Sequence, residues 1–342
     1  MRAMVLRAPW DLVAGEVAPP PPDRRDVLVR VTHSGICGTD YKIFSGAIPV
    51  SYPRVMGHEM AGEVVVAGDS TTVRAGDRVI VDPEQYCGAC FHCRIGQTEL
   101  CPHGTLVGRD VDGGFAEYVA APSSHVFPLP AAIGSRAAPL VQVLTTCVHA
   151  QRQIDIFPAE SAVVFGLGVT GQLHVQLAKA RGASPVIGVT RSADKRALAE
   201  KLGADLTIPG GDGAVDRVRE ATGGRGADVV IETVGSVASL ASCIDMTRSG
   251  GRVLMFGIIT AKEGALPFYD LYFREITLIG ARVARSEDYP ASMAMIERGL
   301  VRLDPLISEV MPLDDLKAAI GKLGSDSGQR MKIIMDHGGT AT

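Results

Sequence analysis

The sequence feature that most constrains the fold is a glycine-rich turn between a short apolar segment and a helical one. Residues 162–165 (Ala-Val-Val-Phe) are a continuous apolar run, which is typical of a strand buried on both faces of a sheet. Gly-Leu-Gly-Val-Thr-Gly follows at once, and then come a predicted helix over 172–181 and a predicted strand over 185–189. Such a glycine motif is weak evidence alone, but in this order the segments predict a βαβ unit whose turn can hold a pyrophosphate.

Strands and helices continue to alternate after this unit. The next predicted elements are a helix over 193–202 and strands over 227–232, 250–257 and 275–280. With helical segments between them, these strands indicate a doubly wound α/β sheet. The chain ends with predicted helices over about 289–299 and 313–323 and a strand over 331–335. We expect this tail to return to the first domain.

The part of the chain before about residue 130 is predicted to be rich in β-structure, with no helical period of any length. Strands are predicted over 26–32, 60–66 and 77–81, with glycines near their ends. Two short polar motifs lie beside these strands, Cys-Gly-Thr-Asp at 37–40 and Gly-His-Glu at 57–59. We expect both motifs in loops, where scaffolds often carry their chemistry.

These two motifs supply a thiolate, an imidazole and a carboxylate, from Cys37, His58 and Glu59. Each is a good zinc ligand once deprotonated, and three protein ligands with an open fourth position are typical of a catalytic zinc site. Each residue also has a simpler explanation, because a buried cysteine usually packs and a lone histidine is usually a satisfied core or surface group. The cysteine cluster and the glycine turn favour the metal.

Four of the seven cysteines fall within fifteen residues, at Cys87, Cys90, Cys93 and Cys101. In a long chain that looks cytosolic, clustered cysteines bind metal more often than they pair as disulfides. Their C-x2-C-x2-C-x7-C spacing lets four thiolates converge on one tetrahedral ion with no open position, which predicts a structural zinc site. The alternatives are four unrelated thiols, or a nucleic-acid-binding zinc ribbon, which usually has two well separated knuckles and basic flanks that are missing here.

Length and charge limit the remaining classes of function. The 342 residues are enough for two domains, and the formal net charge of -4 comes without a basic tract. We therefore expect no nucleic-acid partner and no anionic membrane partner. The longest apolar stretches are too short to span a bilayer, and the first residues lack an apolar signal core, so a cytoplasmic protein is predicted.

In the order and spacing of these features the chain resembles the zinc-dependent medium-chain dehydrogenases, the family of the alcohol, sorbitol and threonine dehydrogenases. The resemblance rests on the four clustered cysteines and on residues 35–40, 57–59, 166–171 and 274–280. It implies an α/β protein with a GroES-like β-rich catalytic domain, a doubly wound Rossmann domain and an active site in the cleft between them. The implied boundaries are 1–153 for the catalytic domain, including a structural zinc lobe at about 84–104, 154–288 for the Rossmann domain, and 289–342 for a C-terminal return to the catalytic domain.

The resemblance also implies two zinc ions per chain and roles for individual residues. Cys37, His58 and Glu59 would bind the catalytic zinc, and the four clustered cysteines the structural one. Thr39 would hydrogen-bond the substrate oxygen and start the proton path, while Asp40 would orient the zinc histidine unless it is merely a turn residue. Zinc would lower the pKa of the substrate hydroxyl, and hydride would pass to the nicotinamide. The implied cofactor-binding positions are Gly166, Gly168, Val169, Gly171 and Thr146.

Several positions depart from the pattern of many family members. Lys42 stands where many have a relay histidine, so protons would leave through water or the cofactor ribose, and a solvated surface lysine is the alternative. Gln142 replaces the Cys, Asp or Glu expected near the metal, and a neutral amide is a weak zinc ligand. Thr190 and Arg191 stand where NAD-dependent relatives have an aspartate that repels a 2′-phosphate. A hydroxyl and a guanidinium suit that phosphate, so NADP(H) is favoured and NAD(H) is the alternative.

The expected function is hydride transfer between a secondary alcohol, polyol or sugar-derived substrate and a nicotinamide cofactor. The expected ligands are small-molecule alcohols or ketones, with Phe44, Phe115 and Arg282 as candidates for the substrate pocket. A homodimer or homotetramer is predicted. Two other classes stay open: a zinc-free quinone or enoyl reductase on the same fold, which a metal assay would separate, and a non-catalytic metal-binding protein, which turnover of any alcohol would reject.

Overall fold

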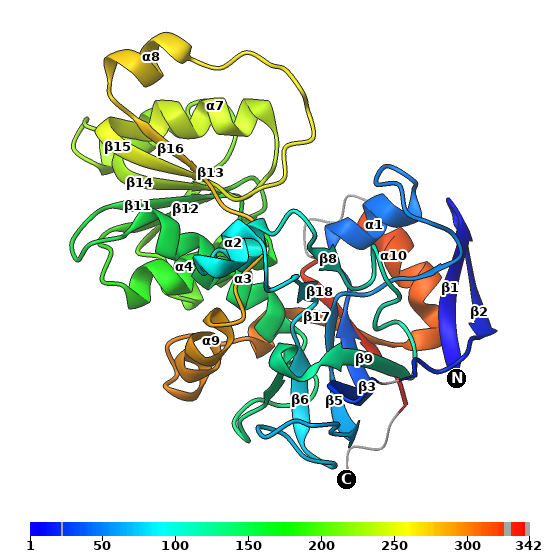
Figure 1. Cartoon of the computed structure of the whole chain (residues 1–342). Helices are drawn as coiled ribbons and strands as arrows, with labels where there is room; N and C mark the ends of the chain where they lie inside the picture. The colour runs from blue at the N-terminus through cyan, green and yellow to red at the C-terminus, as the bar shows by residue number, and fades with distance from the viewer. Residues whose placement is uncertain (22, 325–329, 339–342) are drawn as a thin grey trace. The chain divides into compact units, whose positions relative to one another are not determined.

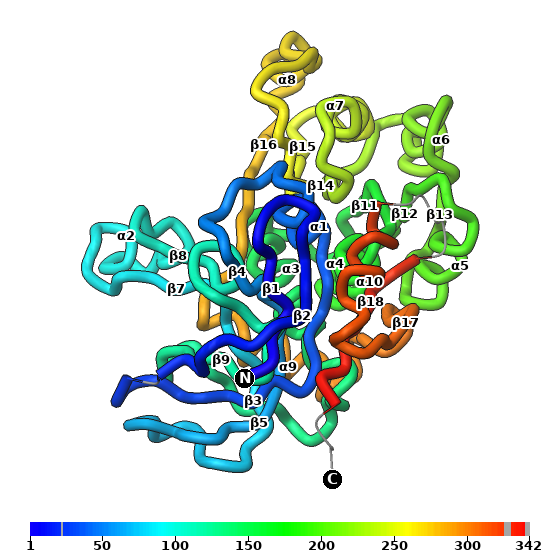
Figure 2. The backbone as a smooth tube through the Cα atoms, turned by 90° about the vertical axis from the view of Figure 1, so that its right-hand side faces the viewer, coloured from blue at the N-terminus to red at the C-terminus, as the bar shows by residue number. Residues whose placement is uncertain are grey.

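The structure, a computed structural model, describes residues 1–21, 23–324 and 330–338. The chain forms two compact units, labelled by element in Figure 1 and followed along the backbone in Figure 2. Unit 1 comprises Met1–Thr145, Ala284–Arg298 and Leu303–Thr342, and unit 2 comprises Thr146–Val283 and Gly299–Arg302. In the described part of the chain, no helix combines the length and the apolar character that crossing a membrane requires.

Unit 2 is built on a parallel sheet with the strand order β13-β12-β11-β14-β15-β16. The strands are β11 (Ala162–Phe165), β12 (Val186–Thr190), β13 (Leu206–Pro209), β14 (Ala227–Glu232), β15 (Thr247–Met255) and β16 (Thr277–Gly280). Neighbouring strands are parallel, so each needs a crossover connection. The crossover helices are α4 (Val169–Ala180), α5 (Ala193–Lys201), α6 (Ala214–Ala221), α7 (Val237–Met246) and α8 (Phe268–Phe273). Figure 1 shows α7 and α4 on opposite faces of the sheet.

Alternate residues of the central strand β11 explain why helices cover both faces of this sheet. Ala162 and Val164 belong to one apolar cluster, which includes Val175 of α4. Val163 belongs to a second cluster, which includes Leu240 of α7. The continuous apolar run in the sequence is needed because both faces of the strand are buried. The doubly wound α/β fold predicted from the sequence is confirmed.

Unit 1 is rich in β-structure. Its largest sheet has the order β10-β6-β5-β3-β18-β17, with β9 also paired to β3, and smaller sheets are β2-β1-β4 and β7-β8. The strands are β1 (Arg2–Ala8), β2 (Asp11–Glu16), β3 (Asp26–Gly35), β4 (Arg54–Val55), β5 (Glu59–Val66), β6 (Arg78–Val81), β7 (Glu84–Gln85), β8 (Thr105–Leu106), β9 (Tyr118–Pro122), β10 (Val126–Pro128), β17 (Ile307–Pro312) and β18 (Lys332–Asp336). Because β18 pairs antiparallel with β3, a C-terminal segment is joined directly to an N-terminal strand.

Unit 1 also contains helices, and one of them corrects the sequence analysis. The helices are α1 (Gly38–Phe44), α2 (Phe91–Arg94), α9 (Asp288–Glu297), α10 (Leu316–Gly324) and the start of α3 (Leu140–Ile154). The expectation that residues 37–40 form a loop, in a region without helices, is wrong. Cys37 caps α1: its sulfur accepts the N–H of Thr39 at 3.3 Å, and its own N–H donates to Asp40 at 2.9 Å. This cap and the burial of Ile43 stabilise a helix too short to show a period.

Candidate active site and metal centres

Two strands of unit 1 bring the predicted three-ligand group together. β3 and β5 are antiparallel neighbours, and Gly35 at the end of β3 pairs with Glu59 at the start of β5. Cys37 follows β3 and His58 precedes β5, so the predicted loop placement is right for His58 and wrong for Glu59. The Sγ of Cys37, a ring nitrogen of His58 and a carboxylate oxygen of Glu59 lie within 4.8 Å of one another. The three groups are close enough to hold one metal ion.

His58 is held between a sulfur and a carboxylate. Its Nε2 lies 2.9 Å from the Sγ of Cys37, and its Nδ1 lies 3.5 Å from an oxygen of Asp40, which is fully buried. Burial lowers the pKa of His58, but the charges of Cys37 and Asp40 outweigh burial and raise that pKa well above its usual value. The site therefore attracts positive charge. The imidazole turns Nε2 toward the sulfur and Nδ1 toward a carboxylate, which is the orientation of a metal-binding histidine, so zinc fits the donor set.

Glu59, the third member of this group, is paired with a lysine that the sequence analysis missed. Lys332 in β18 places its Nζ 2.7 Å from both carboxylate oxygens and 3.0 Å from the carbonyl oxygen of Ile36. The side chains of Lys332 and Glu59 are only 4% and 3% exposed. Gly35 provides the space, because a Cβ there would overlap an oxygen of Glu59. The available signal was a lysine within the otherwise apolar segment 331–335.

The structure places the other predicted residues of unit 1 as follows. Thr39 is half-buried in the first turn of α1, and Lys42 is half-buried in its last turn. Gln142 is buried near the start of α3. Phe44 and Phe115, the candidates for the substrate pocket, belong instead to the hydrophobic core of unit 1. Their large apolar side chains are used for packing, which corrects the sequence analysis.

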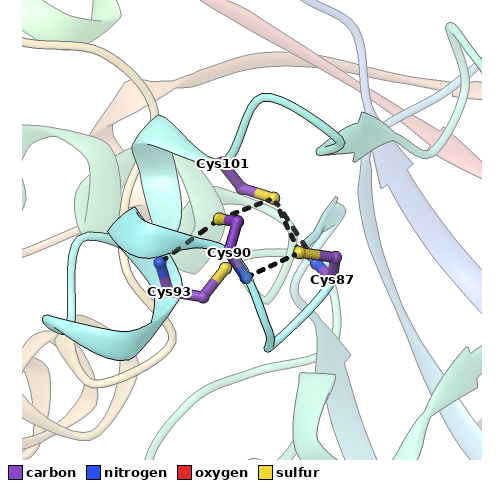
Figure 3. A group of neighbouring side chains, drawn as sticks. All are labelled: Cys87, Cys90, Cys93 and Cys101. Carbon is purple, nitrogen blue, oxygen red and sulfur yellow. Dashed lines mark hydrogen bonds between the residues drawn. The ribbon is translucent and has the colours of Figure 1, made fainter.

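The four clustered cysteines converge, and their side chains point toward one another (Figure 3). The Sγ of Cys101 lies 3.6 Å from that of Cys87 and 3.9 Å from that of Cys90. Four sulfurs at ~2.3 Å from a tetrahedral zinc are about 3.8 Å apart, so the cluster has the dimensions of a four-cysteine zinc site. Hydrogen bonds from the backbone of Ala89 and Cys90 lower the pKa of Cys87 to about 6, which favours a thiolate. The short helix α2 carries Cys93.

The cysteine lobe, which comprises about residues 84–104, is tied to the segment before α9 by an ion pair whose carboxylate is buried. Glu99 accepts two hydrogen bonds from Arg285, at 2.8 and 2.9 Å, in a bidentate arrangement, and the Glu99 side chain is almost fully buried. Beside the lobe, Asp82 accepts a hydrogen bond from Ser286 at 2.8 Å. Burial raises the pKa of Asp82 to about 7. Sequence reasoning missed these contacts because their partners are far apart in the chain.

A second candidate site lies at the carboxyl ends of the parallel strands of unit 2. A pocket of about 340 Å³ is lined by the glycine turn, the end of β12, the residues after β13 and the start of α7. Three residues predicted to contact a cofactor, Gly166, Thr190 and Arg191, are among those that line it. Thr146, another predicted contact, lies at the start of unit 2 within α3. Clefts at this end of an α/β sheet are where such folds bind nucleotides.

The glycine turn itself has the geometry that a pyrophosphate requires. Gly166 has a φ of +96°, which favours glycine, and a Cβ at Gly171 would overlap the carbonyl oxygen of Gly166. A Cβ at Gly168 would meet no atom within 4 Å, so there is open space at the N-cap of α4. α4 begins at Val169 and not at residue 172 as predicted. Its N-terminal N–H groups therefore face an open turn, and a dinucleotide fits there.

Comparisons with known proteins agree with this geometry. Residues 23–131 match the model of the alcohol dehydrogenase GroES-like domain, and residues 169–298 match that of the zinc-binding dehydrogenases. An L-threonine 3-dehydrogenase of Symbiobacterium thermophilum is 34% identical over 347 aligned positions, which cover 97% of this chain and 98% of that protein. The chain belongs to the zinc-binding medium-chain alcohol dehydrogenase family. The L-galactonate-5-dehydrogenase of Escherichia coli is another relative, 31% identical over 320 positions that cover 92% of this chain and 93% of that one.

Solved structures of other dehydrogenases share the fold. A protein of Sinorhizobium meliloti, described as a zinc-binding dehydrogenase and bound to NADP, has a TM-score of 0.91 and 31% identity, with 98% of each chain covered. The alcohol dehydrogenase TADH of Thermus sp. ATN1 has a TM-score of 0.90 and 28% identity, covering 98% of this chain and 99% of that one. The predicted GroES-like and Rossmann architecture is confirmed, and the protein is a zinc-type NAD(P)-dependent dehydrogenase.

Proposed function

We propose that this dehydrogenase transfers a hydride between a secondary alcohol, polyol or sugar-derived substrate and a nicotinamide cofactor, with NADP(H) preferred. The observation that carries the proposal is the convergence of Cys37, His58 and Glu59 within 4.8 Å. This set favours a zinc enzyme over a zinc-free reductase of the same fold. Relatives named for sorbitol, L-galactonate and L-threonine support the substrate class, because each of these compounds carries a secondary hydroxyl group.

Each side chain of the proposed site has a separate task. Cys37, His58 and Glu59 would hold the zinc, which when bound lowers the pKa of a substrate hydroxyl. Asp40 would keep the proton of His58 on Nδ1, so that Nε2 stays free for the ion. Thr39, in the first turn of α1, would hydrogen-bond the substrate hydroxyl and accept its proton for transfer to solvent. Proton exit would then use water or the cofactor ribose.

Gln142 is proposed to lie beside the catalytic zinc without being a strong ligand. Its amide would hold a water or a substrate hydroxyl. An amide carries no charge, so the site would be more positive than in relatives with a carboxylate at this position. Such a site should pull harder on the oxygen of a bound hydroxyl.

The proposed preference for NADP rests on the end of β12. Thr190 and Arg191 line the pocket of unit 2, and no carboxylate stands at either position to repel a 2′-phosphate. A hydroxyl and a guanidinium can both donate hydrogen bonds to that phosphate, and those from the guanidinium are charge-assisted. We expect a higher kcat/KM with NADP(H) than with NAD(H). We also expect a reversal or near-equality in the Thr190→Asp/Arg191→Leu variant.

The test of the proposed reaction is a panel of polyols, sugar acids and secondary alcohols, followed by nicotinamide absorbance with each cofactor. Cys37→Ala should abolish turnover, and its melting temperature should show that it still folds. Turnover that persists in Cys37→Ala would contradict the zinc mechanism. A better kcat/KM with NAD would defeat the cofactor preference alone. A failure of every alcohol and ketone would favour the non-catalytic alternative.

We further propose that the protein is a homodimer formed through one edge of unit 2. β16 is the last strand of its sheet, and within the described residues its outer edge has no partner strand. Beside it, α8 exposes Phe268, Tyr269, Tyr272 and Phe273 by 65–83%. An unpaired strand edge with an exposed aromatic face favours association. A second copy fits best, because two β16 strands can pair antiparallel about a two-fold axis and cover both aromatic faces.

Light scattering after gel filtration tests the dimer. The unmodified protein should be a dimer, and the Tyr272→Glu variant should be shifted toward a monomer. Phe91→Glu is the matched control, because Phe91 is 70% exposed in the cysteine lobe of unit 1 and should leave the dimer intact. A dimer that survives Tyr272→Glu would contradict this interface. A tetramer would show that a second surface also associates.

Two other expectations from the sequence remain proposals. The domain boundaries after residues 153 and 288 can be tested by expressing residues 154–288 alone, which should give a folded fragment. The cytoplasmic location can be tested by cell fractionation, where the protein should follow cytoplasmic markers. Recovery with the membrane fraction would contradict it.

A further inference from the structure

The segment that joins β12 to α5 is held by an arginine that does not itself line the pocket. Arg196, within α5, donates from Nη1 to the carbonyl oxygens of Thr190 and Arg191, at 2.9 Å each. The carbonyl of Thr190 also accepts the N–H of Gly210, at 3.0 Å. One guanidinium therefore fixes two successive peptide groups at the point where the chain leaves the sheet and enters the pocket.

Fixing these carbonyls also fixes the opposite side of the same peptide planes. In a planar trans peptide, the N–H of the next residue points away from the C=O. The N–H groups of Arg191 and Ser192 are therefore directed away from Arg196. Ser192 is held from the other end as well, because its hydroxyl caps α5 by accepting the N–H of Lys195 at 3.4 Å. The segment cannot rotate without breaking the hydrogen bonds of Arg196.

Arg191 and Arg196 belong to the same segment, but their side chains differ in exposure and in hydrogen-bond partners. Arg191 lines the pocket and is exposed, and its guanidinium has no partner in the described part of the chain. Arg196 is half-buried, and its guanidinium is engaged by backbone carbonyls. Arg191 is thus available to a ligand, whereas Arg196 acts on the backbone that carries Arg191.

We propose that Arg196 is a positioning residue that makes the cofactor pocket selective for the 2′-phosphate of NADP. By holding the carbonyls of Thr190 and Arg191, Arg196 fixes the orientation of the Arg191 backbone N–H and side chain. These groups then form an anion-binding site before the cofactor arrives. The inference rests on the proposed NADP preference and adds the residue that enforces it. Charge-assisted hydrogen bonds to a phosphate are about twice as strong as neutral ones, so a displaced donor costs more with a phosphate than with a ribose hydroxyl.

The experiment compares nucleotides that differ only in the 2′-phosphate. Binding of 2′,5′-ADP and of 5′-AMP is measured by calorimetry on the full-length protein, and kcat and KM are measured with NADP and NAD. The variants are Arg196→Met, which removes the donors, and Arg196→Lys, which keeps a charge that can reach one carbonyl. The matched control is Arg219→Met, because Arg219 in α6 also donates to a backbone carbonyl, that of Asp245, which is not a pocket-lining residue.

Arg196→Met should weaken 2′,5′-ADP binding and raise the KM for NADP by about tenfold or more, because the charge-assisted contacts lose their alignment. Binding of 5′-AMP should change by less than about threefold, since 5′-AMP has no 2′-phosphate. The kcat at saturating NADP should change as little, since it does not depend on the contacts that bind the 2′-phosphate. Arg196→Lys should fall between Arg196→Met and the unmodified protein, and Arg219→Met should resemble the unmodified protein. Melting temperatures show which variants are folded. If Arg196→Met does not fold, the comparison is made with Arg196→Lys.

Two outcomes separate this inference from the proposal on which it rests. If the unmodified protein binds 5′-AMP as tightly as 2′,5′-ADP, the NADP preference itself fails, and the inference falls with it. If the unmodified protein discriminates and Arg196→Met discriminates equally well, only the inference is overturned. Equal weakening of both nucleotides would also overturn it, because a general structural role would act on the whole pocket.

Discussion

Replacing Lys332 by methionine should destabilise unit 1 by several kcal/mol. The Nζ of Lys332 donates to both oxygens of Glu59 at 2.7 Å and to the carbonyl of Ile36 at 3.0 Å, so its three N–H groups are all used. Methionine keeps most of the length of the side chain and removes all three donors. Removing one partner of a buried ion pair costs about 3–5 kcal/mol, because the other charge stays buried without compensation.

The loss of stability caused by Lys332→Met should depend on zinc, because Glu59 is also a predicted ligand of the catalytic ion. A bound zinc supplies positive charge that the lost ammonium no longer provides. The destabilisation should therefore be smaller with zinc than without it, and linkage makes the difference equal to the gain in zinc-binding free energy. A difference of about 1.4 kcal/mol corresponds to a tenfold change in affinity, so if zinc reduces the destabilisation by at least that amount, Lys332→Met binds the catalytic zinc at least about tenfold more tightly.

Urea denaturation, followed by the fluorescence of Trp10, measures these changes. Trp10 is the sole tryptophan, and its ring lies 5.0 Å from that of Phe44 within unit 1. The fully loaded protein is compared with protein dialysed against chelator until the unmodified chain keeps only its structural zinc. Glu59→Gln completes a double-mutant cycle, in which the two losses should be far from additive.

An exposed ion pair provides the control for this prediction. Lys322 lies 2.5 Å from Glu309, and the two side chains are 43% and 39% exposed. Lys322→Met should therefore cost less than about 1 kcal/mol. A loss below about 1 kcal/mol for Lys332→Met in the zinc-poor protein would refute the reasoning from burial. Equal losses with and without zinc would show that Glu59 does not share its charge with the ion.

Other properties of the protein can be tested in the same way. Metal analysis of protein purified without chelator should give two zinc ions per chain, and a value near one or zero would contradict the two sites. Cys90→Ala should mainly lower stability, because structural zinc contributes folding free energy, and unchanged melting would count against that role. Gln142→Glu should raise the alkaline pKa of alcohol oxidation, because an added negative charge weakens the pull of zinc on the hydroxyl. A lower alkaline pKa in the pH–rate profile would refute this. Burial raises the pKa of Asp82 from 3.8 to about 7, so its stabilising contribution is present below 3.8 and is lost as the pH rises through 7. The free energy of unfolding of Asp82→Asn should therefore rise relative to the unmodified protein between those pH values, and a constant difference would contradict the raised pKa.

The parts of the fold that could be predicted are those specified by short stretches of sequence. The run at 162–165 must be apolar throughout because helices cover both faces of β11, and the glycines after it must lack side chains because a Cβ at Gly171 would overlap the carbonyl of Gly166. The spacing of the four cysteines likewise allows only a few local arrangements, and their sulfurs do meet. Such constraints act within one motif, so the sequence shows them directly.

The parts that could not be predicted depend on contacts between distant segments. Helix α1 is stabilised by a cap in which Cys37 takes the place of the usual serine or aspartate, so no ordinary helix signal precedes it. Phe44 and Phe115 have the size and polarity of pocket residues, but the burial of both in one core follows from how their segments pack. Lys332 gave a signal, a charge inside an apolar strand, but its partner Glu59 is found only once β18 and β5 both flank β3.

The same contrast distinguishes residues that contact a ligand from residues that position those contact residues. The proposed zinc ligands Cys37, His58 and Glu59 come from motifs that are compact in sequence, because atoms that bind one ion must converge within a few ångströms. Lys332 and Arg196 need only reach a carboxylate or a carbonyl, and a long flexible side chain can do so from another element. Substitutions of the ligands should therefore reduce turnover itself. Substitutions of Lys332 or Arg196 should change stability, zinc affinity or cofactor selectivity while kcat at saturation is largely kept.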